Sequence, residues 1–277
     1  MLVSAKLAPV FDYATLEGFW RDADELGFHA VWNYDHFYGL GHGLSEQQQP
    51  TLEGWTTLAA MAKVVKRSRI GCMVTGVTYR HPALLANMAV AVDHISGGRL
   101  DFGIGAAWHE PEHRGYGMPF PSAGARIAML DEALQVIKLL WTTERASHSG
   151  EHFTLTDALC EPKPVQAPHP PIVIGGTGER KMLRVVATHA DEWNGVSFDP
   201  AEWGRLNAVL DGHCDAIGRD PKSIRRGAQL FLHPQQEGQM AQQLATFGAY
   251  EDAGCEHIVL SFYQPPDRAQ LEAVAPK

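Results

Sequence analysis

The sequence has few cysteines, and none belongs to a paired motif. Its 277 residues contain four, Cys72, Cys160, Cys214 and Cys255, which stand far apart without a Cys-x-x-Cys spacing. No charged-then-apolar signal segment opens the chain. This pattern predicts reduced thiols in a cytoplasmic protein.

Long apolar runs and basic clusters are also missing. No apolar stretch approaches the roughly 20 residues that cross a bilayer. The formal net charge is −9, and the 23 Lys and Arg residues are scattered, with the densest run at Lys66, Arg67 and Arg69. That run suits the C-terminal end of a helix, where cations interact favourably with the helix dipole. A membrane role and a nucleic-acid groove are therefore excluded, and the expected partner is a small-molecule substrate.

The chain instead has a globular composition, with 45% apolar residues, and an α/β pattern. Short β-branched runs alternate with amphipathic stretches, as in repeated β–α units around a parallel sheet. The expected strands are Leu2–Leu7, Ala30–Asn33, Ile70–Val77, Leu100–Ile104, Ile172–Ile174, the ADEW segment near Asp191, Arg226–Leu232 and His257–Ser261. Eight such strands close a (β/α)8 TIM barrel, which we expect to form one domain over residues 1–277.

Helix signals and two insertions lie between these strands. Pro82 favours a helix start, and Ser96-Gly97-Gly98 favours its end. A second helix is predicted by an apolar stripe at helical spacing: Ile127, Leu130, Leu134, Ile137 and Trp141. The insertions are Gly39–Pro50, after the second strand, and Thr142–Pro171, after the fourth strand and its helix. We expect both insertions to shape the mouth of a pocket.

The ends of the second and third strands carry candidate chemistry. Asp35 and His36 follow the second strand, and a histidine at the barrel rim can hold or move a proton near neutral pH. The third strand contains Thr75-Gly76-Val77, where a glycine inside a β-branched run indicates either a plain kink or a place where a ligand approaches the backbone.

The ends of the fourth and fifth strands are rich in small residues. Ala106 and Ala107 leave room for a flat ring, and Trp108 can wall the space. The fourth strand lacks the third glycine of a dinucleotide-binding turn, which disfavours a Rossmann fold. The fifth strand ends in Gly175-Gly176-Thr177-Gly178 ahead of a helix. That arrangement is typical of a phosphate site, although a tight turn also explains it.

One motif points to a different chemistry. The run His109-Glu110-Pro111-Glu112-His113 satisfies the H-E-x-x-H pattern of zinc proteases. A zinc site needs both histidines on one continuous helix, and Pro111 disrupts that helix unless it starts near Glu110, which leaves His109 outside. We therefore expect no metal site here.

Taken together, these segments resemble the luciferase-like monooxygenase superfamily, particularly its coenzyme F420-dependent branch. The resemblance lies in LGFHAVWNYDHF, VTGVTYRHPALLANMAVAVDHISGGRLDFGIGAAWHEPEHRGYG and PPIVIGGTGERKMLRVVATHADEWNG, within Leu26–Gly195, and after Phe198 it is only general. It implies a barrel that binds FMN or F420 at its C-terminal face, with a non-prolyl cis peptide often kept behind the ring.

The resemblance also implies roles for residues. His36 would be the catalytic proton donor or acceptor, oriented by Asp35. The implied cofactor-binding residues are Asp35, Thr75, Gly76, Val77, Ala106, Ala107, Trp108, Gly175, Gly176, Thr177 and Gly178.

The sequence departs from the sugar-phosphate dehydrogenases of that branch. They carry an acidic residue where this chain has Trp108, with Glu110 two residues later, and few cations are expected at the mouth. A sugar phosphate is thus a doubtful substrate. We predict F420-dependent hydride transfer on a small organic substrate, with an FMN-dependent monooxygenase and a non-catalytic flavin-binding barrel as alternatives. Because many relatives are dimers, we also expect a homodimer.

Overall fold

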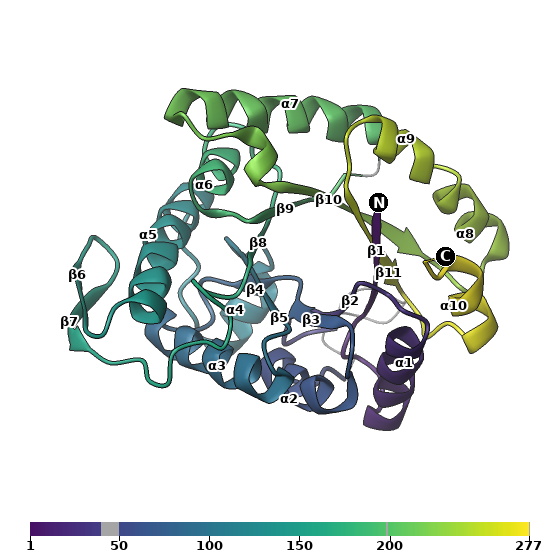
Figure 1. The fold of residues 1–277 in the computed structure, drawn as a ribbon, viewed down its shortest axis with the longest axis horizontal. Coiled ribbons are helices and arrows are strands. Elements are labelled where there is room, and N and C mark those ends of the chain that lie inside the picture. Colours follow the sequence, from purple (N-terminus) through teal and green to yellow (C-terminus); the bar gives the residue numbers. More distant parts are fainter. Residues whose placement is uncertain (40–49, 198, 277) are drawn as a thin grey trace.

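A closed parallel sheet forms the centre of the molecule (Figure 1). The computed structural model describes residues 1–39, 50–197 and 199–276. The nine strands of the sheet run in the order β3-β2-β1-β11-β10-β9-β8-β5-β4, and a β3–β5 pairing closes it. The strands are β1 (Leu2–Leu7), β2 (Ala30–Asn33), β3 (Arg69–Cys72), β4 (Thr75–Gly76), β5 (Leu100–Gly105), β8 (Ile172–Gly175), β9 (Glu192–Gly195), β10 (Arg225–Leu232) and β11 (His257–Phe262).

The predicted (β/α)8 barrel is confirmed, with β3 and β4 as two parts of one barrel strand. Helices surround it (Figure 1). They are α1 (Tyr13–Glu25), α2 (Gly54–Val64), α3 (Pro82–Ser96), α4 (Glu110–Tyr116), α5 (Ala123–Thr142), α6 (Met182–His189), α7 (Pro200–Ile217), α8 (Glu237–Leu244), α9 (Phe247–Asp252), α10 (Arg268–Val274) and a 3-10 turn at Pro221–Ser223. Among the described helices, none has the length and apolarity that a membrane span requires.

Local sequence signals explain where the helices begin and end. The α3 helix starts at Pro82 and ends at Ser96, where the C-cap residue Gly97 adopts a left-handed backbone with φ of 70°. The predicted apolar stripe lies on α5, where Leu130, Leu134 and Ile137 pack in the core. The α3 helix therefore follows the expected proline and glycine signals, and α5 follows the expected apolar spacing.

The third barrel strand differs from the expectation of one strand over Ile70–Val77. It breaks into β3 and β4 around Met73–Val74, whose peptide bond is cis. The residues in this break turn toward the barrel interior, where Met73 packs with Trp32 and Val259. The expected irregularity therefore lies just before Thr75 rather than at Thr75-Gly76-Val77.

The insertion Thr142–Pro171 does not shape the pocket mouth, which corrects the prediction. It connects α5 to the start of β8 and contains an antiparallel hairpin, β6 (Ala146–Ser149) and β7 (Thr154–Ala158). The hairpin lies outside α5 (Figure 1), and none of its residues lines the cavity described below. A segment that precedes a strand lies at the edge where strands begin, away from the catalytic edge. Residues 40–49 of the other predicted insertion lie outside the described residues.

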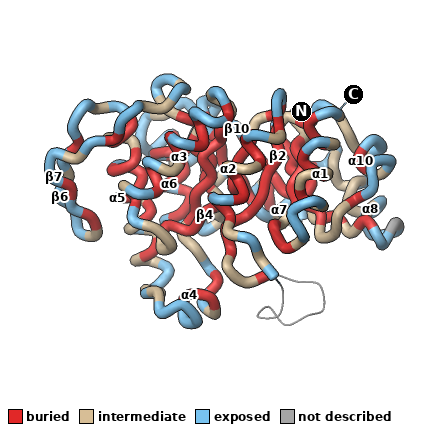
Figure 2. The backbone as a smooth tube through the Cα atoms, turned by 90° about the horizontal axis from the view of Figure 1, so that it is seen from below, coloured by how far each residue is buried: buried red, intermediate tan, exposed pale blue. Residues whose placement is uncertain are grey.

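The barrel interior is layered because alternate side chains of each strand point inward. Near the strand starts, Ser4, Glu192 and His257 form a buried polar group. A thin apolar layer follows, made of Ala30, Trp32, Met73, Val173 and Val259. Beyond it the strands end at an open cavity. Figure 2 shows α4 projecting from one end of the barrel, while the N-terminus lies at the other.

Candidate active site

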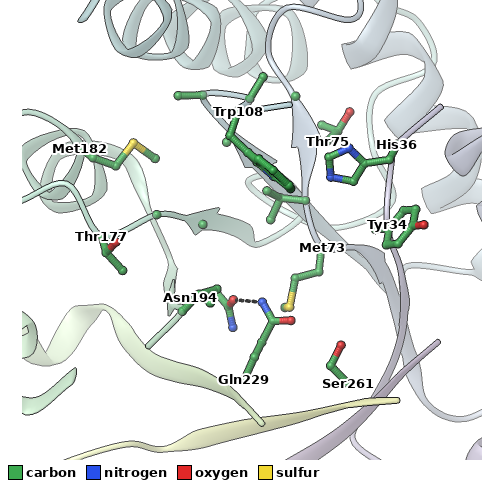
Figure 3. Close-up of a pocket in the computed structure, with 18 of the residues that line it drawn as sticks. Tyr34, His36, Met73, Thr75, Trp108, Thr177, Met182, Asn194, Gln229 and Ser261 are labelled. Atoms are coloured by element: carbon green, nitrogen blue, oxygen red, sulfur yellow. Dashed lines mark hydrogen bonds between the residues drawn. The ribbon is translucent and has the colours of Figure 1, made fainter. Parts of the chain in front are cut away.

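A cavity of about 850 Å3 opens at the C-terminal ends of the strands (Figure 3). Most residues that the sequence nominated are brought together there. Those that line it are His36, Thr75, Gly76, Ala106, Ala107, Trp108, Gly175, Gly176, Thr177 and Gly178. Such a large concave site at this face of a barrel is where catalysis is expected in this architecture.

One wall of the cavity is flat because glycines on β5 and β8 flank Val74. A Cβ added to Gly105 would lie 2.9 Å from a Val74 methyl group, and one added to Gly175 would lie 3.2 Å from it. Side chains at these positions would therefore displace Val74 or fill the space in front of it. We call this wall, from β4, β5 and β8, the glycine wall. Its shape fits the flat ring of a flavin or deazaflavin.

The cavity also offers groups for an anionic tail. Thr177 and Gly178 precede α6, whose N-cap residue Lys181 makes no side-chain capping hydrogen bond. Exposed amides at a helix start attract phosphate. Arg126 of α5 lines the same cavity and donates from Nε to the Ala106 carbonyl at 3.1 Å. Arg126 and Lys6 at the cavity correct the expectation of a mouth poor in cations.

His36 is held from behind by the buried carboxylate of Glu112. Its Nδ1 lies 2.9 Å from Glu112 Oε1, and the same carboxylate accepts from the Phe37 amide at 2.8 Å and from the Tyr79 hydroxyl. Burial alone raises the pKa of Glu112, but the hydrogen bonds from His36, Tyr79 and Phe37 and the nearby His36 charge outweigh it and lower the pKa to about 2. Glu112 therefore stays ionised at neutral pH.

This contact fixes the proton on His36. An ionised carboxylate only accepts hydrogen bonds, so His36 Nδ1 carries a hydrogen and donates it to Glu112, which leaves Nε2 as the nitrogen not engaged by that carboxylate. Among the described residues, Nε2 has no hydrogen-bond partner. The His36 ring lies beside Trp108 at the cavity wall, with ring centroids 5.5 Å apart (Figure 3). The free nitrogen is thus available to a molecule in the cavity.

Asp35 does not orient His36, and it does not line the cavity, contrary to prediction. Its buried carboxylate accepts from both terminal nitrogens of Arg80, at 2.5 and 3.0 Å, and from the Thr75 hydroxyl. Neighbouring side chains of an extended segment point in opposite directions, so Asp35 and His36 face different partners. Asp35 therefore ties the end of β2 to β4 behind the cavity.

Val77 also lies away from the cavity, although the sequence placed it at the cofactor. Its side chain is buried in the core between the barrel and its helices, and its amide donates to the Gly105 carbonyl at 2.9 Å. Only its two predecessors, Thr75 and Gly76, reach the cavity. Its backbone still helps to position the end of β5.

The H-E-x-x-H motif adopts the arrangement that the proline predicts. The α4 helix begins at Glu110, and His109 stands outside it as the N-cap residue. His113 Nδ1 lies 2.8 Å from the His109 carbonyl oxygen and Nε2 lies 2.6 Å from the Thr78 hydroxyl, so both ring nitrogens are occupied. A different trio, His36, His109 and Glu112, brings possible ligand atoms within 4.8 Å of one another. Its carboxylate already accepts the hydrogen bonds described above.

Several cavity residues were not nominated from the sequence. Glu112 occupied only a variable position of the H-E-x-x-H pattern, to which no role was assigned. Lys6, Gln229 and Ser261 stood in predicted strands, where their alternation with apolar residues marks one inward face but does not separate a cavity from a packed core. Asn194 directly follows the predicted ADEW strand. The inward-facing polar residues nearest each strand end were the available signal.

Comparison with known proteins agrees with this geometry. The family described as luciferase-like monooxygenase matches residues 3–274. The chain belongs to this family. Its fold is also similar to that of a solved F420-dependent secondary alcohol dehydrogenase bound to an F420-acetone adduct, with a TM-score of 0.83, 18% identity, and coverage of 99% of this chain and 97% of that one.

Curated relatives of this luciferase-like chain differ in cofactor. An F420-dependent glucose-6-phosphate dehydrogenase of Kineococcus radiotolerans is 27% identical, with 97% of this chain and 80% of the relative covered. An FMNH2-dependent dimethylsulfone monooxygenase of Pseudomonas putida is also 27% identical, with 75% and 57% covered. Uncharacterized mycobacterial relatives are 36% identical over 143 residues, and the match spans about half of their length, 49%. The family is therefore shown, whereas the cofactor branch is not resolved.

Proposed function

We propose that this protein is an oxidoreductase that uses coenzyme F420 to exchange a hydride with a small organic substrate. The observation that carries the proposal is His36, whose Nδ1 is held by buried Glu112 while its Nε2 is available at the cavity. Exchange of a hydride with an alcohol or a carbonyl group also moves one proton, which a positioned imidazole can take or give. Glu112 is then the positioning residue and His36 the catalytic one.

The cavity residues suit a large flat cofactor. When bound, F420 supplies two-electron hydride chemistry, and the protein supplies orientation, desolvation and a proton. The glycine wall would hold the ring, in contact with Thr75, Gly76 and Val74. The turn Gly175–Gly178 and the start of α6 would bind the anionic tail. Ala106, Ala107 and Trp108 would cover the ring edge and exclude water from the side of His36.

Titration of the apoprotein tests the proposal directly. F420 and FMN are added separately, and binding is followed by absorbance and fluorescence. Micromolar binding of F420, followed by reduction of bound F420 by at least one alcohol in a panel, is the expected result. Tight binding of FMN alone would favour the monooxygenase reaction of the FMN-dependent relative. F420 binding without turnover of any alcohol or carbonyl compound favours a non-catalytic barrel, and binding of neither cofactor overturns the assignment.

A further inference from the structure

The wall opposite the glycine wall carries four polar side chains, three of which are joined by hydrogen bonds. Lys6, Gln229, Asn194 and Ser261 come from β1, β10, β9 and β11, which are consecutive in the closed sheet. In the order of eight barrel strands, β11 stands opposite β5 and β1 opposite β8, whereas Asn194 of β9 borders the glycine wall because it pairs with Gly175. Figure 3 shows Gln229, Asn194 and Ser261 on one side of the cavity and His36 with Trp108 on the other. We call these four residues the donor wall.

The direction of the hydrogen bonds along the donor wall is fixed by its lysine. Lys6 Nζ only donates, and it lies 3.0 Å from Gln229 Oε1. The Gln229 amide therefore donates through Nε2 to Asn194 Oδ1, at 2.7 Å. Asn194 Nδ2 is left as a buried donor that has no hydrogen-bond partner among the described residues. The side-chain oxygens of Gln229 and Asn194 thus both accept hydrogen bonds within the group, and N–H donors remain at its two ends, on Lys6 Nζ and Asn194 Nδ2.

The donor wall also holds a cation without a counter-charge. Lys6 is 8% exposed, and its printed hydrogen bond within the described residues goes to the uncharged amide oxygen of Gln229, with no ion pair to a described carboxylate. Burial lowers the pKa of Lys6 to about 8, so its ammonium group is charged at pH 6.5. A buried unpaired charge is costly unless a partner arrives, and a buried donor without an acceptor adds to that cost. Both features disfavour a purely structural role.

We propose that the donor wall is a substrate subsite that binds a negatively charged oxygen, in the simplest case the carboxylate of a small organic acid. The ammonium of Lys6 and the amide of Asn194 are the donors for its two oxygens, and Ser261 adds a hydroxyl group. The inference rests on the proposed function for one step. If a flat ring covers the glycine wall, the donor wall faces the open side of the ring, where a substrate binds.

Matched ligands test the subsite. Benzoate and its uncharged analogue benzamide are titrated by calorimetry at pH 6.5 into the apoprotein and into the cofactor-loaded protein. We expect benzoate to bind at least about tenfold more tightly than benzamide. Lys6→Met should abolish that preference and leave benzamide affinity within about twofold. The matched control is Lys63→Met, which removes an exposed lysine of α2 and should preserve the preference.

A second variant separates loss of charge from loss of fold. Gln229→Glu keeps the side-chain volume and supplies the missing counter-charge, so that Lys6 and Asn194 find their partners within the protein. It should therefore remove the benzoate preference while circular dichroism and thermal unfolding show an intact fold. Equal affinity for benzoate and benzamide in the wild type, or a preference that survives in both variants, overturns the subsite.

The same measurements distinguish the other source of a charged oxygen, the ring of the cofactor. If Lys6→Met changes the cofactor dissociation constant or the absorbance spectrum of the bound reduced cofactor, and the benzoate preference persists, Lys6 serves the ring and the substrate subsite is wrong. The apoprotein titrations are independent of the cofactor. Failure of F420 and FMN binding would thus overturn the proposed function, whereas absent carboxylate selectivity overturns only this inference.

Discussion

The barrel contains two histidine–glutamate pairs that differ in what the second ring nitrogen contacts. At the cavity, His36 Nδ1 lies 2.9 Å from Glu112, and Nε2 is available. At the other end, His257 Nδ1 lies 2.7 Å from Glu192, and Nε2 lies 2.6 Å from the Ser4 hydroxyl. That serine, histidine and glutamate have the connectivity of a hydrolytic triad.

Burial separates the two pairs. Ser4 and His257 are fully buried, and the Ser4 oxygen also accepts from the Ala30 amide at 3.0 Å. The hydrogen-bonding groups of the His257–Glu192 pair are thus all used within the barrel, and no substrate reaches this pair. In the His36–Glu112 pair, Nε2 of His36 has no hydrogen-bond partner among the described residues, and His36 lines the cavity. The same side chains therefore stabilise the fold at one end and are available for chemistry at the other.

The largest effect should come from His36→Ala. Loss of the positioned imidazole should lower kcat by about 10²- to 10⁴-fold, while cofactor affinity changes only a few-fold. Stopped-flow reduction of bound F420 by the best alcohol substrate measures the first quantity, and a binding titration measures the second. Unchanged turnover would rule out His36 as the proton-transfer group.

Substitution in the His257–Glu192 pair should instead lower stability and leave turnover nearly unchanged. His257→Ala leaves Glu192 buried with Arg225, 3.1 Å away, as its remaining ionic partner. We expect a loss of about 3–5 kcal/mol in the free energy of unfolding, measured with urea, because one partner of a buried pair is removed. The folded variant should keep kcat within about threefold. A loss of kcat comparable to that of His36→Ala would contradict the division between the two ends.

Acid should expose the contribution of Glu112 to stability. Its folded-state pKa of about 2 is below the ordinary value of 4.5. The stabilisation is therefore fully present above pH 4.5 and is lost as the pH falls toward 2, by at most about 3 kcal/mol. Thermal unfolding between pH 5 and pH 2.5 should show a steeper loss for the wild type than for Glu112→Gln. Equal slopes would mean that Glu112 is not held as a buried carboxylate.

Lys6→Met should have the smallest effect on stability, and of opposite sign. The folded-state pKa of Lys6, about 8, lies below its ordinary 10.5, so the charged form is destabilised. This destabilisation is complete below pH 8 and vanishes above 10.5. The variant should therefore be about 1–2 kcal/mol more stable as apoprotein at pH 7. In thermal unfolding from pH 8 to pH 10.5, only the wild type should gain this increment; a less stable variant at pH 7 would show that Lys6 supports the fold.

Much of the architecture was predictable because it depends on local signals. The alternation of β-branched runs with amphipathic stretches gave the barrel strands, proline and glycine gave the bounds of α3, and an apolar stripe indicated α5. The position of the break was predicted only approximately. Gly76 indicated an irregularity in the run from Ile70 to Val77, and the resemblance implied a cis peptide behind the ring, but the cis bond lies between Met73 and Val74. The inward turn of Met73 depends on packing with Trp32, which the third strand alone does not encode.

Candidate site residues were predicted where a local sequence signal at the end of a strand marks them. Glycines at strand ends and His36 at the second strand were found this way. The partner of His36 was assigned to Asp35 because the two are adjacent, but Glu112 is 76 residues away and reaches His36 only through the packing of α4. Lys6 is distinguished from structural polar residues by the lack of a counter-charge among the described residues, and Asn194 by the lack of an acceptor for Nδ2, and both depend on the three-dimensional arrangement. The homodimer and the single-domain organisation stay predictions.

The β6–β7 hairpin is a suitable place to insert a label or a tag. It is anchored to α5 because Glu132 accepts from the backbone amides of His152 and Phe153, at 2.9 and 2.7 Å. At its tip, Gly150 and Glu151 are exposed, and exposed loop residues tolerate insertions better than packed elements do. A fluorophore or affinity tag placed between the two strands would therefore report on the whole molecule while remaining remote from the groups that handle protons.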